Sequence, residues 1–282
     1  MFTLKIQNTL GELFELTHDS KQFYVTSITG LTRPATTVNT TTGGVIDGTF
    51  FNSARVEQRN IVITIVINGD IEMTRQRLYR IFPVKTKCTI FFENKAKNVK
   101  IDGYVELLDG DLFTERQTIQ VSIICPRPFF EDAETIVTEL SQVIKEFEFP
   151  FAIEESDPIE FSEVSSSPIV EIQNTGDTVT GFRCTATALK SFSSLVLTNI
   201  TTGEYIRITY SFHTNDIIEI CTVQGNLSAT VTRSGATTSL INNLQDGSKW
   251  FRLAVGKNEL TFTGGTQAVE LEISFNPLHG GV

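Results

Sequence analysis

The hydrophobic pattern of this chain is typical of a protein built mainly from β-strands. The clearest segment is residues 61–67, Ile-Val-Ile-Thr-Ile-Val-Ile, which is apolar on both faces. Such a segment predicts a central strand that is covered on both sides. Shorter runs of apolar or alternating residues predict further strands over 4–6, 23–25, 88–92, 99–101, 104–108 and 118–125.

One segment has a helical period instead. In residues 71–82, the side chains of Ile71, Leu78, Ile81 and Phe82 fall on one stripe at 100° per residue. Pro83 follows directly, and proline interrupts helices. We therefore expect a single helix here, packed on the sheet of an amino-terminal domain.

Residues 168–282 consist of short predicted strands with turn residues between them, roughly every ten residues, which is typical of a β-sandwich. The last two strands are predicted as a hairpin of residues 250–255 and 259–263 around Gly256-Lys257-Asn258. Residues 133–147 fit a helical period, whereas 147–149 alternate like a strand. Both alternatives stay open for this segment.

Composition and charge sharpen this interpretation. The chain holds 38 Thr, 28 Ile and 21 Val, residues that favour pleated sheets, and its 282 residues suggest about two domains. Residues 131–163 contain eleven acidic residues and one basic residue, so they carry the whole net charge of −10. We expect domains at 1–130 and 168–282 with an acidic linker at 131–167. An acidic docking strip for a basic partner is the alternative.

The sequence contains few motifs that indicate catalysis, metal binding or ligand binding. No run of 18 apolar residues and no secretory signal is present, which predicts a protein that neither inserts into a membrane nor is exported. Clustered Lys and Arg are missing, so sequence-specific nucleic-acid binding is disfavoured. The three histidines lack close-spaced ligands, and Cys88, Cys125, Cys184 and Cys221 form no CxxC pair. We expect no enzyme activity, no catalytic residue, no cofactor, no metal, and four buried reduced thiols.

Two places remain as candidate binding sites. Residues 33–48 are rich in Thr and Gly and predict a long loop or an extended hairpin, ending at Gly48. In a strand that follows, Arg55, Glu57 and Arg59 would share one side, either solvated or paired with the acids of a neighbouring subunit. Trp250 is most simply a packing residue, with a sugar-binding platform as the alternative.

The order of several motifs resembles a known family. The first half contains Ile28-Thr29-Gly30-Leu31, the apolar strand 61–67, the helix over 71–82 and Cys125-Pro126-Arg127-Pro128-Phe129-Phe130. The second half contains Asn174-Thr175-Gly176-Asp177, residues 197–204, Gly256-Lys257-Asn258 and the end Asn276-Pro277-Leu278-His279-Gly280-Gly281-Val282. In this order they resemble the distal tail proteins, or Dit family, of long-tailed phages.

This resemblance implies a fold and a role. The fold class would be mainly β, with two β-sandwich-type domains, the first carrying one helix and the second a galactose-binding-like jelly roll. The protein would be a structural part, assembled in the host cytoplasm, that forms a homo-hexameric ring at the virion tail tip. The ring would join the tail tube protein to a baseplate or tail-associated protein, with Arg55, Glu57, Arg59 and Gly48 as interface candidates.

Two other functions stay open at this point. A carbohydrate-binding adhesion module would contact the host surface through Trp250, and a cryptic glycosidase would cleave cell-wall polymers. The resemblance leaves the source open among a phage, a prophage and a phage-tail-like bacteriocin.

Overall fold

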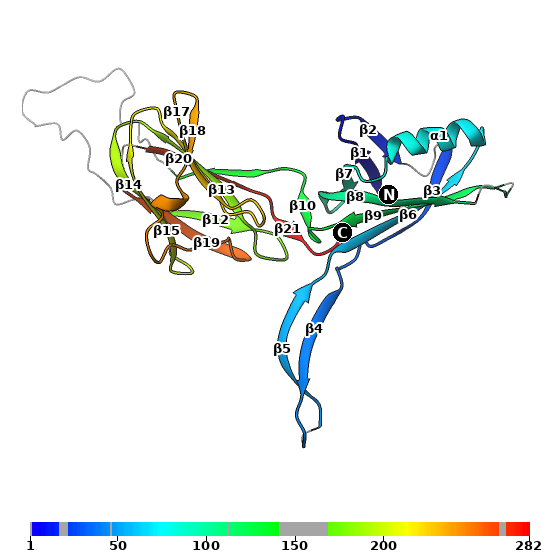
Figure 1. The fold of residues 1–282 in the computed structure, drawn as a ribbon, viewed down its shortest axis with the longest axis horizontal. Coiled ribbons are helices and arrows are strands. Elements are labelled where there is room, and N and C mark those ends of the chain that lie inside the picture. Colours follow the sequence, from blue (N-terminus) through cyan, green and yellow to red (C-terminus); the bar gives the residue numbers. More distant parts are fainter. Residues whose placement is uncertain are drawn as a thin grey trace, which may run out of the picture. The chain divides into compact units, whose positions relative to one another are not determined.

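The computed structural model describes residues 2–16, 22–45, 47–111, 113–114, 116–140, 169–264 and 269–282. Across these residues the chain is mostly β-structure with a single α-helix, which confirms the predicted fold class (Figure 1). The chain divides into two compact units. The first contains Met1–Glu134 and Leu278–Val282, and the second contains Thr135–Pro277.

The first unit is one hydrogen-bonded sheet together with a helix and a separate two-stranded ribbon. Its elements are β1 (Thr3–Gln7), β2 (Leu13–Leu16), β3 (Phe23–Thr29), β4 (Thr36–Thr42), β5 (Thr49–Val56), β6 (Arg59–Ile67), α1 (Ile71–Ile81), β7 (Lys87–Glu93), β8 (Asn98–Gly110), β9 (Thr118–Cys125), β10 (Phe130–Asp132) and β21 (Leu278–His279).

The main path of this sheet runs β2-β1-β7-β8-β9-β6-β3. The long strand β8 connects its two halves, because residues 98–104 pair with β7 and residues 104–110 pair with β9. Both halves contribute to one core, from Leu4 and Ile6 on β1 to Ile61, Ile63 and Ile65 on β6. The prediction that 61–67 is a central strand is confirmed, since β6 lies between β3 and β9.

Helix α1 follows β6 where the sequence predicts it. Asp70 caps its start by accepting a hydrogen bond from the backbone N–H of Met73 at 3.0 Å. Leu78 and Ile81 are buried in the core of the unit, and so is Phe82 directly after the helix. The apolar stripe therefore faces the sheet, as its period indicated.

The first unit is closed by the last residues of the chain. Strand β10 pairs with β8 on one side and with β21 on the other, with Phe130 opposite His279. The boundaries of the two units therefore differ from those expected from the sequence, which placed residue 131 in a linker and residues up to 282 in the second domain. Hydrogen bonding explains the difference: strand pairing holds 130–132 and 278–279 in the first unit.

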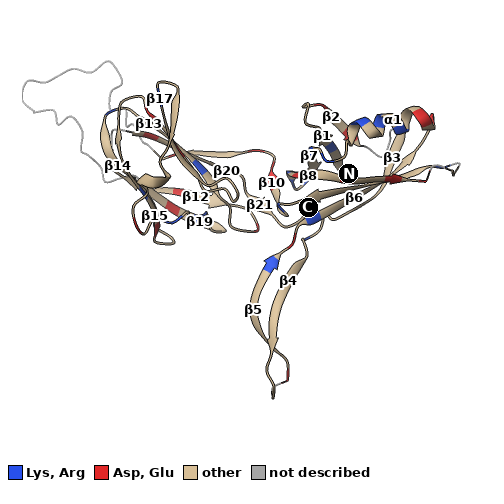
Figure 2. Cartoon of the chain, viewed as in Figure 1, with Lys and Arg blue, Asp and Glu red and all other residues tan. Residues whose placement is uncertain are grey.

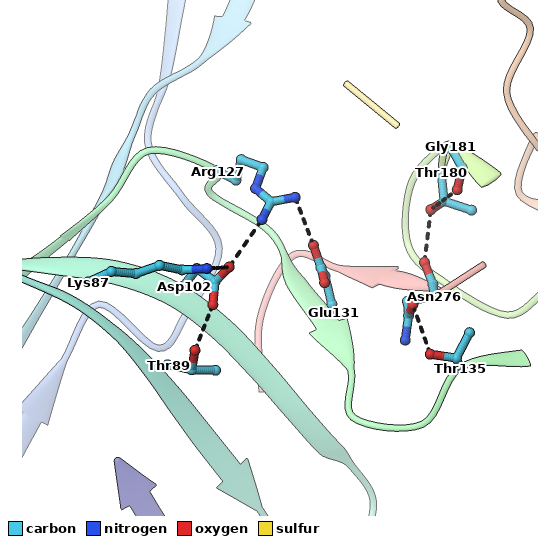
Figure 3. A network of polar contacts seen from close by, with 9 residues as sticks. All are labelled: Lys87, Thr89, Asp102, Arg127, Glu131, Thr135, Thr180, Gly181 and Asn276. Atoms are coloured by element: carbon cyan, nitrogen blue, oxygen red, sulfur yellow. Dashed lines mark hydrogen bonds and ion pairs between the residues drawn. The ribbon is translucent and has the colours of Figure 1, made fainter. Parts of the chain in front are cut away.

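A chain of ion pairs crosses the outer side of this sheet (Figure 3). Asp102 on β8 accepts from Lys87 at 2.9 Å and from Arg127 at 3.2 Å, and Arg127 also contacts Glu131 at 3.3 Å. Burial acts to raise the pKa of Asp102, but the hydrogen bonds from Lys87 and Thr89 outweigh it and the pKa is lowered. The carboxylate therefore stays ionised and connects β7, β8 and the segment before β10.

The second unit consists of two sheets that enclose a core of their own. Its elements are β11 (Ile136–Glu139), β12 (Val170–Asn174), β13 (Phe182–Ala188), β14 (Phe192–Asn199), β15 (Glu204–Phe212), β16 (Ile217–Cys221), β17 (Ser228–Arg233), β18 (Ala236–Ser239), the 3₁₀ turn η1 (Ile241–Asn243), β19 (Gly256–Thr263) and β20 (Val269–Phe275).

One sheet has the order β11-β20-β13-β16-β17-β18 and the other β12-β19-β14-β15. Alternating residues of both sheets, such as Ile218, Ile220, Leu195 and Leu197, meet in the core, which is the arrangement of a sandwich. Just before β13, the hydroxyl of Thr180 donates to the carbonyl of Asn276, which follows β20, at 2.8 Å (Figure 3).

Two local expectations need correction. The predicted last hairpin is wrong, because Gly256-Lys257-Asn258 begins strand β19 and pairs with β12 instead of turning. Residues 250–255 contribute an isolated bridge between Leu253 and Thr180. In the ambiguous segment 133–147, residues Ile136–Glu139 form a strand, so the helical alternative is wrong there; residues 141–147 lie outside the described residues.

All four cysteines are buried free thiols. Burial raises the pKa of Cys88, Cys125 and Cys184 to about 12. Cys88 and Cys125 lie on β7 and β9, on either side of β8, where a Cβ on Gly103 would meet the Sγ of Cys125 at 2.9 Å. Two strand spacings of about 4.8 Å separate such positions, beyond the roughly 7 Å Cα limit for a disulfide.

These thiols are therefore predicted to be unreactive in the folded protein. A thiol reagent added at neutral pH should label none of the four at an appreciable rate, because burial keeps the reagent away from the sulfur atoms and also raises the pKa of Cys88, Cys125 and Cys184. The same reagent in denaturant should label four groups per chain. Fast labelling of Cys88 or Cys125 in the native protein would contradict their burial.

Candidate functional site

The ribbon of β4 and β5 is the part of the first unit that lacks a core. The two strands pair with each other and with no other strand among the described residues. Every residue of β4 is exposed, and so is every residue of β5 except Val56. Residues 33–48 were expected to form a loop or an extended hairpin, and the hairpin is confirmed (Figure 1). An isolated two-stranded hairpin is only marginally stable in water.

The two faces of the ribbon differ in character. Residues 36, 38, 40 and 42 of β4 share one face, and their partners across the ribbon are Val56, Ala54, Phe51 and Thr49. On this apolar face the side chain of Val38 is 54% exposed and that of Phe51 is 67% exposed. Val38 and Phe51 lie on one face of the ribbon, and exposed apolar side chains that gather on one face often mark an interaction surface.

The opposite face is a ladder of polar side chains that also carries Phe50, which lies opposite Thr41 and is 56% exposed. Asn39 donates to the hydroxyl of Ser53 at 3.0 Å, and Asn52 donates to the hydroxyl of Thr41 at 2.6 Å. Asp47 and Arg55 are the charged residues between positions 36 and 56, so the ribbon is nearly uncharged (Figure 2). These polar side chains thus have hydrogen-bond partners within the ribbon, whereas the side chains of Val38 and Phe51 are left exposed.

Arg59 anchors the base of the ribbon. Its side chain is 3% exposed and donates to the backbone carbonyls of Gly30, Thr32, Pro128 and Gly280 at 2.5 to 2.7 Å. The guanidinium carbon also lies 4.5 Å from the centre of the Phe130 ring. Burial lowers the pKa of Arg59, and the four carbonyls compensate for the water that the guanidinium has lost.

Close backbone packing surrounds this arginine. Gly30 has a φ of +84°, and a Cβ there would lie 2.0 Å from the carbonyl oxygen of Asn60. Near the carboxy-terminal segment, Lys97 donates to the carbonyl of Gly281 at 2.8 Å, and the amide of Val282 donates to the carbonyl of Leu31 at 3.2 Å. The segment after β21 is thereby fixed beside the start of the ribbon.

The structure corrects the expected polar face of Arg55, Glu57 and Arg59. One strand does not run through all three, because β5 ends at Val56 and β6 begins at Arg59. Arg59 points into the first unit, where its donors are used, so it is not available to a neighbouring subunit. Arg55 and Glu57 form an exposed ion pair at 3.1 Å, and hydrogen bonds from Thr37 and Arg55 lower the pKa of Glu57.

The other sequence candidates lie apart from this site. Gly48 is exposed between the ribbon strands with a φ of +94°, a conformation that favours glycine. Trp250 is in the second unit, partly buried against its core, as the packing interpretation expects. Among the described residues no group of three or more His, Cys, Asp or Glu is placed to hold a metal ion. No helix in this part of the chain is long and apolar enough to span a membrane.

Comparison with known proteins finds a family model that is similar to most of the second unit. Residues 175–279 match the model of the siphovirus-type tail component, C-terminal domain. The resemblance to phage distal tail proteins is thereby confirmed. No curated protein sequence matches this chain.

Solved structures show a likeness that extends over the whole chain. The crystal structure of the SPP1 Dit protein (gp 19.1) superposes with a TM-score of 0.72 at 14% identity, over 99% of both chains. A chain of the phage P2 baseplate in its activated conformation with calcium gives 0.55 at 11% identity, over 97% of this chain and 98% of that one. The strontium form gives 0.52 at 12% identity, with the same coverage. At these identities the likeness is one of fold.

Two features of the site were missed from the sequence. The sequence does not reveal the apolar face of the ribbon, because a bulge at Asn52 shifts the register. As a result Phe51 and Ala54 share a face although they are three residues apart. The role of Arg59 was missed because its four partners come from three distant parts of the chain. An arginine at the start of the most apolar strand was the one available signal.

The Arg59 contacts predict a large and local loss of stability. Arg59→Met keeps the apolar stem but removes every donor to the four carbonyls, so the free energy of unfolding of the first unit should fall by about 3–5 kcal/mol. Amide hydrogen exchange along β6 measures the stability of the first unit alone. The signal of Trp250 reports separately on the second unit.

Arg55→Met is the matched control, because it removes the same charge from an exposed position four residues away. It should leave exchange along β6 unchanged within error. Equal effects of the two substitutions would show that loss of charge, and not the four carbonyl contacts, causes the destabilisation.

Proposed function

We propose that this chain is a structural subunit of a phage tail-tip hub and that its first unit closes a hexameric ring with other copies. The ring would join the tail tube protein to a baseplate or tail-associated protein of the virion. The family of the second unit supports a tail component. The similar SPP1 protein is described as a paradigm of a hub adsorption apparatus, and the other similar chains belong to a baseplate.

The observation that carries the proposal is the uncovered apolar face of the ribbon. A ribbon without its own core gains stability when a second layer covers Val38 and Phe51. In a ring of identical subunits, each ribbon would lie on a different surface of the next copy, which is a head-to-tail contact that closes. Exposed apolar side chains on β8, Tyr104 at 47% and Leu107 at 52%, are candidates for the receiving surface.

The residues that the sequence suggested for the ring contact do not all have the same role in this proposal. Arg55, Glu57 and Gly48 lie on the ribbon or at its base, and they remain candidates for contact with a neighbouring copy. Arg59 acts within its own subunit by holding the base of the ribbon. The joining of tube to baseplate and assembly in the host cytoplasm belong to the same proposal.

Placing charge on the apolar face should break the ring without unfolding the subunit. In Val38→Asp with Phe51→Asp, two carboxylates would have to be buried in the contact, which is strongly unfavourable. Native mass spectrometry should show hexamers for the wild-type protein and monomers for this variant. Unchanged amide exchange along β6 would confirm that the variant subunit stays folded.

The control places the same two charges on the opposite face, as Asn39→Asp with Asn52→Asp. This variant should still form hexamers, because the polar face remains solvated in the proposed contact. A Val38/Phe51 variant that forms hexamers as readily as the control would rule out the apolar face as the ring contact.

A further inference from the structure

The turn between β6 and α1 contains a dipeptide that can modify itself chemically. Asn68 and Gly69 are both exposed, and Asn68 is the only asparagine of the chain that is followed by glycine. Asparagine is one of the thermolabile residues of proteins, and glycine has no Cβ that would shield its backbone nitrogen. We propose that Asn68 is a site of spontaneous deamidation, a covalent modification that goes beyond the proposed hub.

The two reacting groups are free to approach each other. Among the described residues, the side-chain amide of Asn68 and the backbone N–H of Gly69 have no hydrogen-bond partner. An exposed side chain changes its rotamer on the picosecond-to-nanosecond timescale. Gly69 has a φ of +89°, a conformation that glycine adopts without strain. Neither group therefore has to break a contact before the reaction begins.

The backbone on both sides of the dipeptide is held by hydrogen bonds. The N–H of Asn68 donates to the carbonyl of Gln22 at 2.7 Å. Asp70 caps α1 by accepting from the N–H of Met73 at 3.0 Å, and its carbonyl accepts from the N–H of Thr74 at 3.1 Å. The modification would thus occur in a short exposed segment between a fixed strand and a fixed helix.

The reaction needs water as its co-reactant and no enzyme. The nitrogen of Gly69 attacks Cγ of Asn68 and forms a new C–N bond. The side-chain nitrogen leaves as ammonia and takes the proton that the glycine nitrogen has lost. Water then opens the cyclic imide. Cleavage between Cγ and the glycine nitrogen gives aspartate, and cleavage between the backbone carbonyl carbon and that nitrogen gives isoaspartate, whose main chain is longer by one carbon.

Three other asparagines show which conditions oppose the reaction. Asn226 is exposed, but Leu227 follows it, and a branched side chain shields the attacking nitrogen. Asn52 is exposed, but its side-chain amide donates to Thr41 at 2.6 Å. Asn199 is 0% exposed and is followed by isoleucine. Asn68 combines exposure, a free side chain and a following glycine.

The position of the turn makes the two products differ in their effect on α1. Aspartate at position 68 keeps the main chain and adds a negative charge close to the start of the helix, where the helix dipole favours it. Isoaspartate lengthens the main chain between the bond to Gln22 and the cap at Asp70. Because both ends are held, we expect isoaspartate to disturb the cap and aspartate to preserve it.

The test incubates the folded full chain in mildly alkaline buffer and follows each asparagine by peptide mapping with mass spectrometry. Asn68 should deamidate at least about tenfold faster than Asn226, which corresponds to a barrier lower by about 1.4 kcal/mol. The rate should rise with pH, because the nitrogen of Gly69 must lose its proton. Amide exchange at Met73 and Thr74 should be faster in the isoaspartate form.

Asn68→Gln is the blocking variant, because its longer side chain would have to close a larger ring, and it should lose the modification. Asn226→Gln is the matched control at another exposed asparagine and should leave the rate at Asn68 unchanged. Asn68→Asp reproduces the aspartate product and should keep exchange at Met73 slow.

Equal rates at Asn68 and Asn226 in the folded protein would overturn the proposal. So would deamidation of Asn68 that occurs only after denaturation, because the folded turn would then prevent the attack. None of these outcomes bears on ring formation, which native mass spectrometry measures separately.

Discussion

One buried guanidinium joins three parts of the first unit that lie far apart in the sequence. Arg59 binds the carbonyls of residues 30 and 32, of Pro128, and of Gly280. Because the side chain is buried away from water, its donors depend on these four carbonyls. The first unit therefore includes the end of the chain, and the polypeptide enters the second unit and returns.

The same contact determines what the ribbon can do. Residues 30 and 32 come a few residues before β4, and Arg59 comes a few residues after β5, so the arginine holds both ends of the ribbon at one place. A ribbon fixed at its base can remain extended while its apolar face is uncovered and able to bind a partner. This is the physical basis of the proposed ring, in which a second copy supplies the missing layer.

Local patterns predicted the local parts of the structure. The run of residues 61–67, the stripe from Ile71 to Phe82 and the isolated cysteines each contain their own signal, and strand, helix and buried thiols are confirmed. Features that depend on distant partners were not predicted. The Arg59 contacts and the pairing of β21 both arise where segments remote in sequence meet, and the periodicity within one segment does not reveal such contacts. A bulge within the ribbon and another in β14–β15 also break the alternation from which faces are assigned.

The most direct test of the central claim is a double-mutant cycle between Arg59 and the end of the chain. Amide exchange along β6 would give the stability of the first unit in Arg59→Met, in a chain lacking residues 280–282, and in the combination. If Arg59 acts by binding Gly280 and the segments beside it, the second change should cost much less once the first is made. Strictly additive losses would contradict the account, because they would mean that the arginine and the carboxy-terminal segment stabilise the unit independently.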